Sequence, residues 1–394
     1  MYLYPEISNT AMWLLCIAFL AGLMLAAIYF FRVRSVAVYR RKADHERPRK
    51  ADSDFLPASI VVYSQGDSEP LQTLLAQLLN QQYPAAYEII VVNEGESADV
   101  RDTVSMLRAS HPNIYLTFTP EGVVNLSRKK LALTLGIKAA RYDIVVLTTS
   151  AVEIESPLWL RNVMQPFDRD GKIDIVLGFA YSDPDEDDSR GRRCRAFDAA
   201  ADSVRWLGPA IVGKPFRGTE YNIAYRKKAF LDNKGFARSL NLHYGDDDIF
   251  ISEIVRPGNT AVELSDASMV RLRNGNHPRI FSERVLRHVF TESFIRRRPR
   301  ILMPLTGWLQ IVAFTAAIVA GVLDYPNLYA TAIAAVIIVL ICVMDILFWR
   351  KALHALKARS LCLTIPWFSA TYPIRRLIRK LHSRISKQKK YTWT

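Results

Sequence analysis

The chain has 394 residues, 50% of them hydrophobic, and its Lys and Arg side chains outnumber Asp and Glu by 52 to 38. A composition this apolar excludes an intrinsically disordered protein. The four cysteines show no CxxC spacing, so neither a zinc site nor a disulfide framework is indicated. The length allows one large domain with additional segments.

The excess of positive charge, formally +14, lies outside the central part of the chain. Residues 55–290 contain 28 basic and 30 acidic side chains, whereas the remaining residues contain 24 and 8. This distribution is typical of anchoring to the anionic lipids of a bilayer, and it argues against nucleic acid as a partner. The cations outside the centre fall in four clusters that flank apolar segments: 32–50, 296–300, 350–359 and 375–390.

Three apolar segments are predicted to span a membrane. Residues 12–31 contain no charged side chain, and as a helix they are long enough to cross a hydrocarbon core of about 30 Å. A cleaved signal peptide is the competing interpretation, but no Lys or Arg precedes this run. Residues 303–323 and 328–348 are predicted to form a helical hairpin. We interpret Asp345, near the end of the last segment, as an interfacial carboxylate close to Arg350, with an intramembrane site as the alternative.

The basic clusters predict how the chain crosses the membrane. No Lys or Arg precedes Arg32, whereas eight occur from Arg32 to Lys50, which places the N-terminus outside and the central domain in the cytoplasm. We expect an integral protein of a bacterial inner membrane. Residues 361–374 are too short and too rich in proline to span, so they are expected in the membrane interface. Beyond Pro373 we expect a basic amphipathic helix on the membrane surface.

From residue 57 onward, short apolar runs alternate with helical periodicities, as in a parallel α/β sheet. Such sheets bind ligands at the carboxyl ends of their strands, so the loops that start at Ser64, Asn93 and Thr149 are candidate binding loops. The predicted elements of this first half are strands at 58–63, 88–92, 113–119 and 143–148, and helices at 68–82, 99–110 and 128–140. The second half is less regular, with a helix at 156–167, a strand at 173–181 and a helix at 192–207.

Within residues 57–295, six blocks follow one another: SIVVY, LLNQQYP, YEIIVVNEGES, LSRKKLALTLGIKAARYDIVVLTTSAVEIESPLWL, GTEYNIAYRKKAFLDNKGF and GDDDIF. In this order and spacing the chain resembles the membrane-attached family 2 glycosyltransferases. The resemblance implies an α/β, Rossmann-like GT-A fold with a nucleotide-binding half and an acceptor-binding half. The expected domains are an N-terminal transmembrane helix with a basic linker (1–54), the glycosyltransferase-like domain (55–298), a transmembrane hairpin (299–350) and an interfacial segment with a basic tail (351–394).

The same resemblance implies a set of site residues. Asp247 of the GDDD block takes the position of the general base that accepts the proton of the acceptor hydroxyl, with Asp246 as its acidic neighbour. The alternative is a helix N-terminus decorated with acids that favour the helix dipole. The other expected substrate contacts are Glu94, at the position of the aspartate that contacts the nucleobase, Lys129, Lys130, Asn222, Asp248, Arg284, Arg287 and His288.

For the cations among these residues, surface positions are the alternative. Lys129 and Lys130 open a helix after the third strand, where they either meet a phosphate or form a solvated pair. Arg284, Arg287 and His288 share one helix face by their spacing, which is either a ligand contact or a solvated cationic face.

The resemblance also implies a Mg²⁺ or Mn²⁺ ion at a DxD motif, but the corresponding stretch here reads LTTSA. Thr149 and Ala151 replace the two acids, and hard divalent cations prefer carboxylate oxygens. The cation is therefore in doubt, and the sequence identifies no metal ligands. Glu153 and Glu155 follow closely, although a surface loop before a helix is the simpler interpretation of both.

Two classes of function remain open. The first is an inverting, membrane-bound hexosyltransferase that moves a sugar from a nucleotide sugar to a lipid-linked or glycan acceptor, with Lys130, Arg284 and Arg287 compensating part of the diphosphate charge. The second is a catalytically degenerate binding or scaffolding subunit that keeps the fold. The retained GDDD block favours the first class, and the missing DxD acids favour the second.

Overall fold

The structure, a computed structural model, describes residues 7–45, 50–119, 126–167, 171–183, 189–295, 302–325, 327–358 and 361–385. The chain divides into two compact units. The first unit contains the apolar helices and comprises Met1–Val38, Arg190–Gly208 and Arg300–His382. The second unit contains the β-sheets and comprises Tyr39–Ser189, Pro209–Pro299 and Ser383–Thr394.

In the described part of the chain, three helices are long and apolar enough to cross a membrane. The first runs through α1 (Asn9–Ile28), the π-helical segment η1 (Tyr29–Val33) and α2 (Arg34–His45). The other two are α11 (Leu302–Leu323) and α12 (Leu328–Ala355). The predicted N-terminal span and the C-terminal hairpin are thus confirmed as helices of sufficient length and hydropathy.

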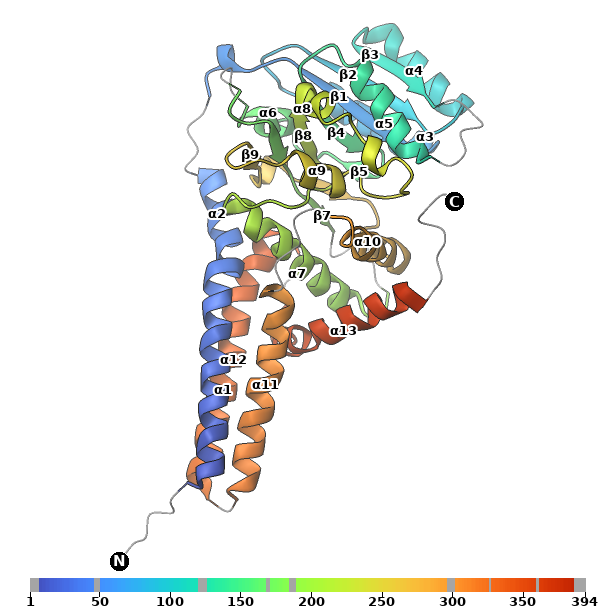
Figure 1. Ribbon diagram of the computed structural model, residues 1–394. Coiled ribbons are helices and arrows are strands. Elements are labelled where there is room, and N and C mark those ends of the chain that lie inside the picture. Colours follow the sequence, from blue (N-terminus) through green and yellow to red (C-terminus); the bar gives the residue numbers. More distant parts are fainter. Residues whose placement is uncertain are drawn as a thin grey trace, which may run out of the picture. The chain divides into compact units, whose positions relative to one another are not determined.

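These three helices lie side by side (Figure 1). Small residues let helix backbones approach one another where no hydrophobic driving force from water exists. The buried small residues at these contacts are Ala11, Ala18, Ala316, Ala317, Ala320 and Ala334.

Asp345 lies inside this helical unit. Its side chain in α12 has no solvent exposure, and its Oδ2 accepts a hydrogen bond of 2.5 Å from Nε2 of Gln310 in α11. Asp345 is therefore a buried carboxylate on the helix face that packs against α11, and its expected depth at the membrane interface stays a prediction.

The last described helix, α13 (Ile365–Ile385), runs through Pro373 without interruption. We expected a helix only beyond this proline. Its ring packs against Gly307 of α11, where an added Cβ would lie 2.3 Å from Cδ of Pro373. On the basic side of α13, Arg375 donates from Nε to Asp198 of α7 (Arg192–Ile211) over 3.1 Å. The helix therefore begins earlier than predicted because tertiary contacts stabilise it around the proline.

Seven described strands form the main sheet of the second unit, in the order β3-β2-β1-β4-β8-β6-β9 (Figure 1). Its first half is parallel and consists of β1 (Ala58–Ser64), β2 (Tyr87–Asn93), β3 (Ile114–Phe118) and β4 (Ile144–Thr149). The helices α3 (Ser68–Leu79), α4 (Ala98–Ser110) and α5 (Arg128–Ala139) alternate with these strands along the chain. Every residue of β1 and β4 is buried, which explains their nearly continuous apolar sequence. The predicted elements of this half are confirmed, with ends that differ by at most three residues.

The other strands complete the sheet and form a second one. In the main sheet, β8 (Ile223–Arg226) runs antiparallel to both β4 and β6 (Ile175–Leu177), and β9 (Thr260–Val262) pairs with β6. The second sheet has the order β5 (Val152–Glu153), β10 (Val270–Leu272) and β7 (Ala180–Ser182). The remaining helical elements are α6 (Trp159–Met164), α8 (Lys227–Asp232), α9 (Ile249–Ile254) and α10 (Pro278–Thr291), with the 3-10 turns η2 (Asp52–Asp54), η3 (Ala237–Ser239) and η4 (Asp266–Ser268).

Two predictions for the second half are wrong. The expected strand at 173–181 is divided into β6 and β7, which belong to different sheets. Between them, Gly178 approaches Asn222 so closely that an added Cβ would lie 2.4 Å from Cγ of that residue. The expected helix at 156–167 is shorter, since only Trp159–Met164 is α-helical.

Candidate active site

A cavity of about 570 Å³ lies at the carboxyl ends of β1, β2 and β4. The chain after β1 contributes Gln65, the chain after β2 contributes Glu94, and Thr149, Ser150 and Ala151 come from the end of β4. The three predicted binding loops therefore meet at one place, as expected for a ligand site of an open α/β sheet. The described charged residues that line the cavity are five cations and three acids: Arg128, Lys129, Arg273, Arg284 and Arg287, and Glu94, Glu220 and Glu283.

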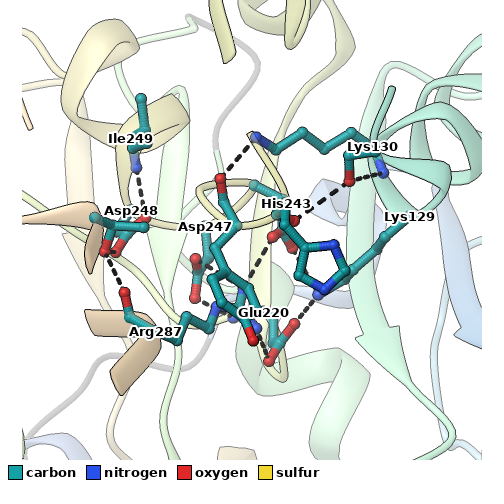
Figure 2. Close-up of polar contacts among 12 residues, drawn as sticks. Lys129, Lys130, Glu220, His243, Asp247, Asp248, Ile249 and Arg287 are labelled. Carbon is teal, nitrogen blue, oxygen red and sulfur yellow. Dashed lines mark hydrogen bonds and ion pairs between the residues drawn. The ribbon is translucent and has the colours of Figure 1, made fainter. Parts of the chain in front are cut away.

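Two of these cations, Lys129 and Arg287, hold a cluster of carboxylates at the cavity wall (Figure 2). Lys129, in the first turn of α5, pairs with Glu220 and also lies 2.8 Å from Oδ2 of Asp246. Arg287, in α10, pairs with Glu220 and places Nη2 2.8 Å from Asp246 and 3.0 Å from Asp247. We call these five residues the ion-pair cluster. Its two cations line the cavity and pair with the aspartates of the GDDD block.

The charges of the ion-pair cluster act on one another strongly because the cluster is buried. Burial would raise the pKa of Asp246, but the positive charges of Lys129 and Arg287 hold this pKa well below the usual range of a carboxyl group. Burial lowers the pKa of Lys129, and the charge of Asp246 opposes that shift. For Arg287, the charges of Asp247 and Asp246 overcome burial and raise the pKa of the guanidinium. Asp246 is therefore an ionised carboxylate held by two cations.

Asp247, the expected general base, has both carboxylate oxygens engaged. Oδ1 pairs with Arg287, and Oδ2 accepts a hydrogen bond of 3.2 Å from the backbone N–H of Glu220. The side chain is only 3% exposed, while both of its partners line the cavity. An acceptor hydroxyl can therefore reach Asp247 only if one of these contacts is exchanged. Contacts of this kind commonly rearrange when substrate binds, so the geometry is compatible with the predicted role.

Asp248 caps a helix. Its Oδ1 accepts a hydrogen bond of 2.8 Å from the backbone N–H of Ile249 at the start of α9, and its Oδ2 accepts one from the hydroxyl of Thr291. Burial, followed by the neighbouring charge of Asp247, raises the pKa of Asp248 well above the usual range. The expected substrate contact of Asp248 is wrong, and the alternative of a helix-capping acid holds for this residue.

Lys130 also stabilises the fold and is not among the residues that line the cavity. Its side chain has no solvent exposure, and burial lowers the pKa of its ammonium group to about 8. The expected phosphate contact of Lys130 is wrong, because the ammonium lies among backbone oxygens in the interior. It donates hydrogen bonds to the carbonyl groups of Ser239, Leu242 and Tyr244. Lys130 thereby fixes the loop that brings His243 and Tyr244 to the cavity.

Asn222 is likewise buried and bonded to the backbone. Its Nδ2 donates to the carbonyl of Phe179 over 3.2 Å and to that of Ser268 over 2.8 Å. Its Oδ1 accepts from the indole of Trp159 over 3.3 Å. The expected substrate contact is wrong here too, since the amide joins the two sheets at the point where Gly178 makes room for it.

The other expected contacts divide between the cavity and its surroundings. Glu94 lines the cavity and accepts a hydrogen bond from the hydroxyl of Tyr63, whose pKa is raised by burial and by the Glu94 carboxylate. Arg284 lines the cavity together with Arg287. His288 instead contacts Arg217 through Nδ1, so the predicted cationic face of α10 is only partly directed to the site.

Among the cavity-lining residues that the sequence did not identify are Glu220, Arg273 and His243. Glu220 joins both cations of the ion-pair cluster, and its only sequence signal is its place just before the NIAYRK block. Arg273 follows the short strand β10, which no apolar run indicated. His243 lies next to Tyr244, and burial together with the charge of Arg287 lowers the pKa of its imidazole.

The loop after β4 does not offer the ligands of a divalent cation. Thr149 and Ala151 line the cavity where the resemblance implies two aspartates. Glu153 is paired with Arg271 and with Arg273, and Glu155 lies 3.3 Å from Arg271. Across the described ranges, no three His, Cys, Asp or Glu side chains are grouped so as to hold a metal ion. These residues do not fit a hard cation that prefers several carboxylate oxygens.

Comparison with known proteins gives the family. The sequence profile described as glycosyl transferase family 21 matches residues 15–378. The chain belongs to this family. The expected resemblance to family 2 glycosyltransferases is confirmed, and so is the mixed α/β GT-A fold with candidate membrane helices at both ends. A comparison with curated protein sequences gave no match.

Of the solved structures compared with this family 21 glycosyltransferase, a mannosyltransferase resembles it in fold. The mannosyltransferase PcManGT from Pyrobaculum calidifontis, in complex with GDP-Man and Mn²⁺, has a TM-score of 0.53 at 17% identity and covers 92% of this chain and 99% of its own. TarS 1–349 from S. aureus has a TM-score of 0.39 at 14% identity, with 84% and 92% covered. Glucosyl-3-phosphoglycerate synthase from Mycobacterium tuberculosis, in complex with phosphoglyceric acid, has 0.37 at 14%, with 62% and 86% covered.

Proposed function

We propose that this glycosyltransferase binds a nucleotide sugar in the cavity at the ends of β1, β2 and β4 and transfers the sugar, with inversion, to an acceptor at a membrane. The observation that carries the proposal is the cavity itself, in which cations and the ion-pair cluster face the loops that bind nucleotides in α/β folds. Glu94, with Tyr63 beside it, would contact the nucleobase in this proposal. Lys129, Arg284 and Arg287, which line the cavity, would contact the diphosphate in this proposal.

In the proposed reaction, the oxygen of an acceptor hydroxyl forms a bond to the anomeric carbon, and the bond from that carbon to the diphosphate breaks on the opposite face. The electron pair leaves with the diphosphate, and a carboxylate accepts the hydroxyl proton. Cations around the cavity stabilise the negative charge that develops on the leaving group. Release of the nucleoside diphosphate then completes the cycle.

Two carboxylates are candidates for the base. Asp247 has the position implied by the resemblance, whereas Glu220 lines the cavity directly. Both are held by Arg287, and Glu220 is held by Lys129 as well. A bound diphosphate would compete with these carboxylates for the two cations. Donor binding itself would then release a carboxylate to accept the proton, so that the base is free only when there is a sugar to transfer.

The membrane part of the proposal rests on the three apolar helices and on the basic clusters beside them. We propose that the N-terminus lies outside, that the cavity lies in the cytoplasm of a bacterial cell at the inner membrane, and that the basic clusters bind anionic lipids. The acceptor would be a lipid-linked sugar or a glycan. Reporter fusions placed after Lys50 and after Asn327 should then report opposite sides, and the same side for both would contradict this topology.

The function is tested by calorimetric titration of the purified full chain with a panel of nucleotide sugars that includes GDP-mannose and UDP-glucose, followed by assay of nucleoside diphosphate release in the presence of membrane lipids. Saturable binding with turnover supports the transferase. Binding without turnover on any acceptor would favour the catalytically degenerate binding subunit. Absence of binding to every donor would refute the proposal.

A further inference from the structure

We propose that the guanidinium of Arg273 takes the place of the divalent cation beside the loop after β4, where it binds the diphosphate of the donor. This inference rests on the proposed function, because it assumes a nucleotide sugar in the cavity. The GT-A fold implies a divalent metal ion at this loop, but the residues of the loop do not suit one.

The strand register brings Arg273 to the second of the two positions that lack an acid. In the antiparallel pair β5–β10, Arg271 lies opposite Glu153 and Leu272 lies opposite Val152. The next residue continues the ladder, since the backbone N–H of Arg273 donates to the carbonyl of Ala151 over 3.0 Å. Arg273 is therefore tied to the loop by its backbone. Its position is fixed to the turn in which the resemblance implies metal-binding aspartates.

The side chain of Arg273 lines the cavity and is only partly engaged. Its Nε lies 3.1 Å from Oε1 of Glu153, and the side chain remains 22% exposed. Within the described ranges, its two terminal nitrogens have no hydrogen-bond partner. A guanidinium held at Nε still presents its terminal N–H groups as a fork, which suits the paired oxygens of a phosphate.

Three other cations near the loop have two or three ion-pair partners each in the structure without a ligand. Arg271 pairs with three acids, Glu153, Glu155 and Asp183, and it is not among the residues that line the cavity. Lys129 and Arg287 are paired with the carboxylates of the ion-pair cluster, including Asp246. Arg273, with Glu153 as its ion-pair partner, is therefore less engaged than Arg271, Lys129 or Arg287. Glu153 positions it and prevents the guanidinium from turning away from the cavity.

The test uses the full chain in detergent or nanodiscs, with UDP and GDP as probes and EDTA present throughout. Arg273→Gln should weaken binding of whichever diphosphate binds the wild type by about tenfold or more, the effect expected when a charged hydrogen-bonding partner is lost. Arg273→Lys, which keeps the charge without the fork, should recover part of that loss. The matched control is Arg271→Gln, which removes the same charge two residues away, within β10, and breaks the same kind of contact to Glu153. It should change binding by no more than about twofold, within the spread of substitutions remote from a ligand.

Each outcome decides between the possibilities. Equal binding by wild type and Arg273→Gln would overturn the inference while leaving the proposed function in place. Equal weakening by Arg273→Gln and Arg271→Gln, at unchanged melting temperatures, would also overturn it, because the effect would then pass through Glu153. Loss of wild-type binding in EDTA with recovery in Mn²⁺ would assign the charge to a metal and not to Arg273. If the wild type binds neither diphosphate under any condition, the proposed function itself fails.

Discussion

Replacing Arg287 by methionine should destabilise the second unit strongly, because Arg287 is the partner of three carboxylates in the ion-pair cluster. The side chain is 8% exposed, and Asp246 and Asp247 are each 3% exposed. Removing one partner from a buried ion pair typically costs about 3–5 kcal/mol, since a charge is left buried without compensation. Here Lys129 would remain to hold Glu220 and Asp246.

The expected loss appears as a lower melting temperature in scanning fluorimetry of the detergent-solubilised protein. For a unit of this size, about 3–5 kcal/mol corresponds to a decrease of roughly 6–20 °C. The matched control is Arg101→Met, which breaks the pair with Glu96 on the surface of α4, where both side chains are about half exposed. Exposed pairs contribute at most about 1 kcal/mol, so this control should unfold close to the wild type.

The pH dependence of Arg287→Met provides an independent check. In the wild type, the pKa of Asp246 is held low in the folded state, so its stabilising contribution is present above the unfolded value of about 4 and is lost only in stronger acid. Without Arg287, the pKa values of the buried acids should rise, because their charge is no longer compensated. The difference in melting temperature between the variant and the wild type should therefore shrink as the pH falls from 7 toward 4. A variant that melts within about 2 °C of Arg101→Met at pH 7 would refute the ion-pair cluster as a source of stability.

Two other predictions concern the acids around the cavity. Asp248→Asn should become more stable relative to the wild type as the pH rises from about 4 toward neutrality. The folded state raises the pKa of Asp248, so ionisation of this carboxyl group lowers the stability of the wild type over that pH range. The Asn side chain stays neutral and has no such loss. Melting curves of both proteins across this range test it, and a pH-independent difference would contradict it. Thr149→Asp combined with Ala151→Asp should create or strengthen Mn²⁺-dependent binding of UDP or GDP in titrations, because the pair restores carboxylate ligands at the cavity. No metal effect on the double variant would mean that this loop lacks the geometry of a DxD site.

The sequence predicted the parallel half of the sheet well because its strands are buried on both faces. Runs such as 58–64 and 144–149 are apolar without alternation, and in a chain with intervening amphipathic helices this pattern is typical of parallel strands covered on both sides. The carboxyl ends of the predicted strands then indicated where the cavity lies.

The short strands of the second half gave no such signal. β5 has two residues and β10 has three, and they are far apart in the sequence. Their pairing, which places Arg273 against Ala151, depends on tertiary contacts that no local pattern reports. For the same reason, the division of 173–181 between two sheets was not predicted.

Adjacent residues of one motif also proved to have different environments. Lys129 faces the cavity, while Lys130, one position further along α5, is turned by about 100° and reaches the interior loop at 239–244. In the GDDD block, Asp246 and Asp247 join the ion-pair cluster, and Asp248 caps α9. A motif can show that charge is concentrated at a site. The direction in which the backbone points each side chain then decides which of them faces a ligand.

The measurement that tests the central claim most directly is turnover of a bound nucleotide sugar by the wild type, Asp247→Asn and Glu220→Gln, with donor affinity measured on the same samples. If the cavity is the active site of a transferase, one of the two variants should release nucleoside diphosphate at least about 100-fold more slowly than the wild type, the usual contribution of a positioned general base, while binding the donor nearly as well. The slow variant identifies the base. Wild-type turnover that survives in both variants would contradict the account, because neither carboxylate of the ion-pair cluster would then take part in the chemistry.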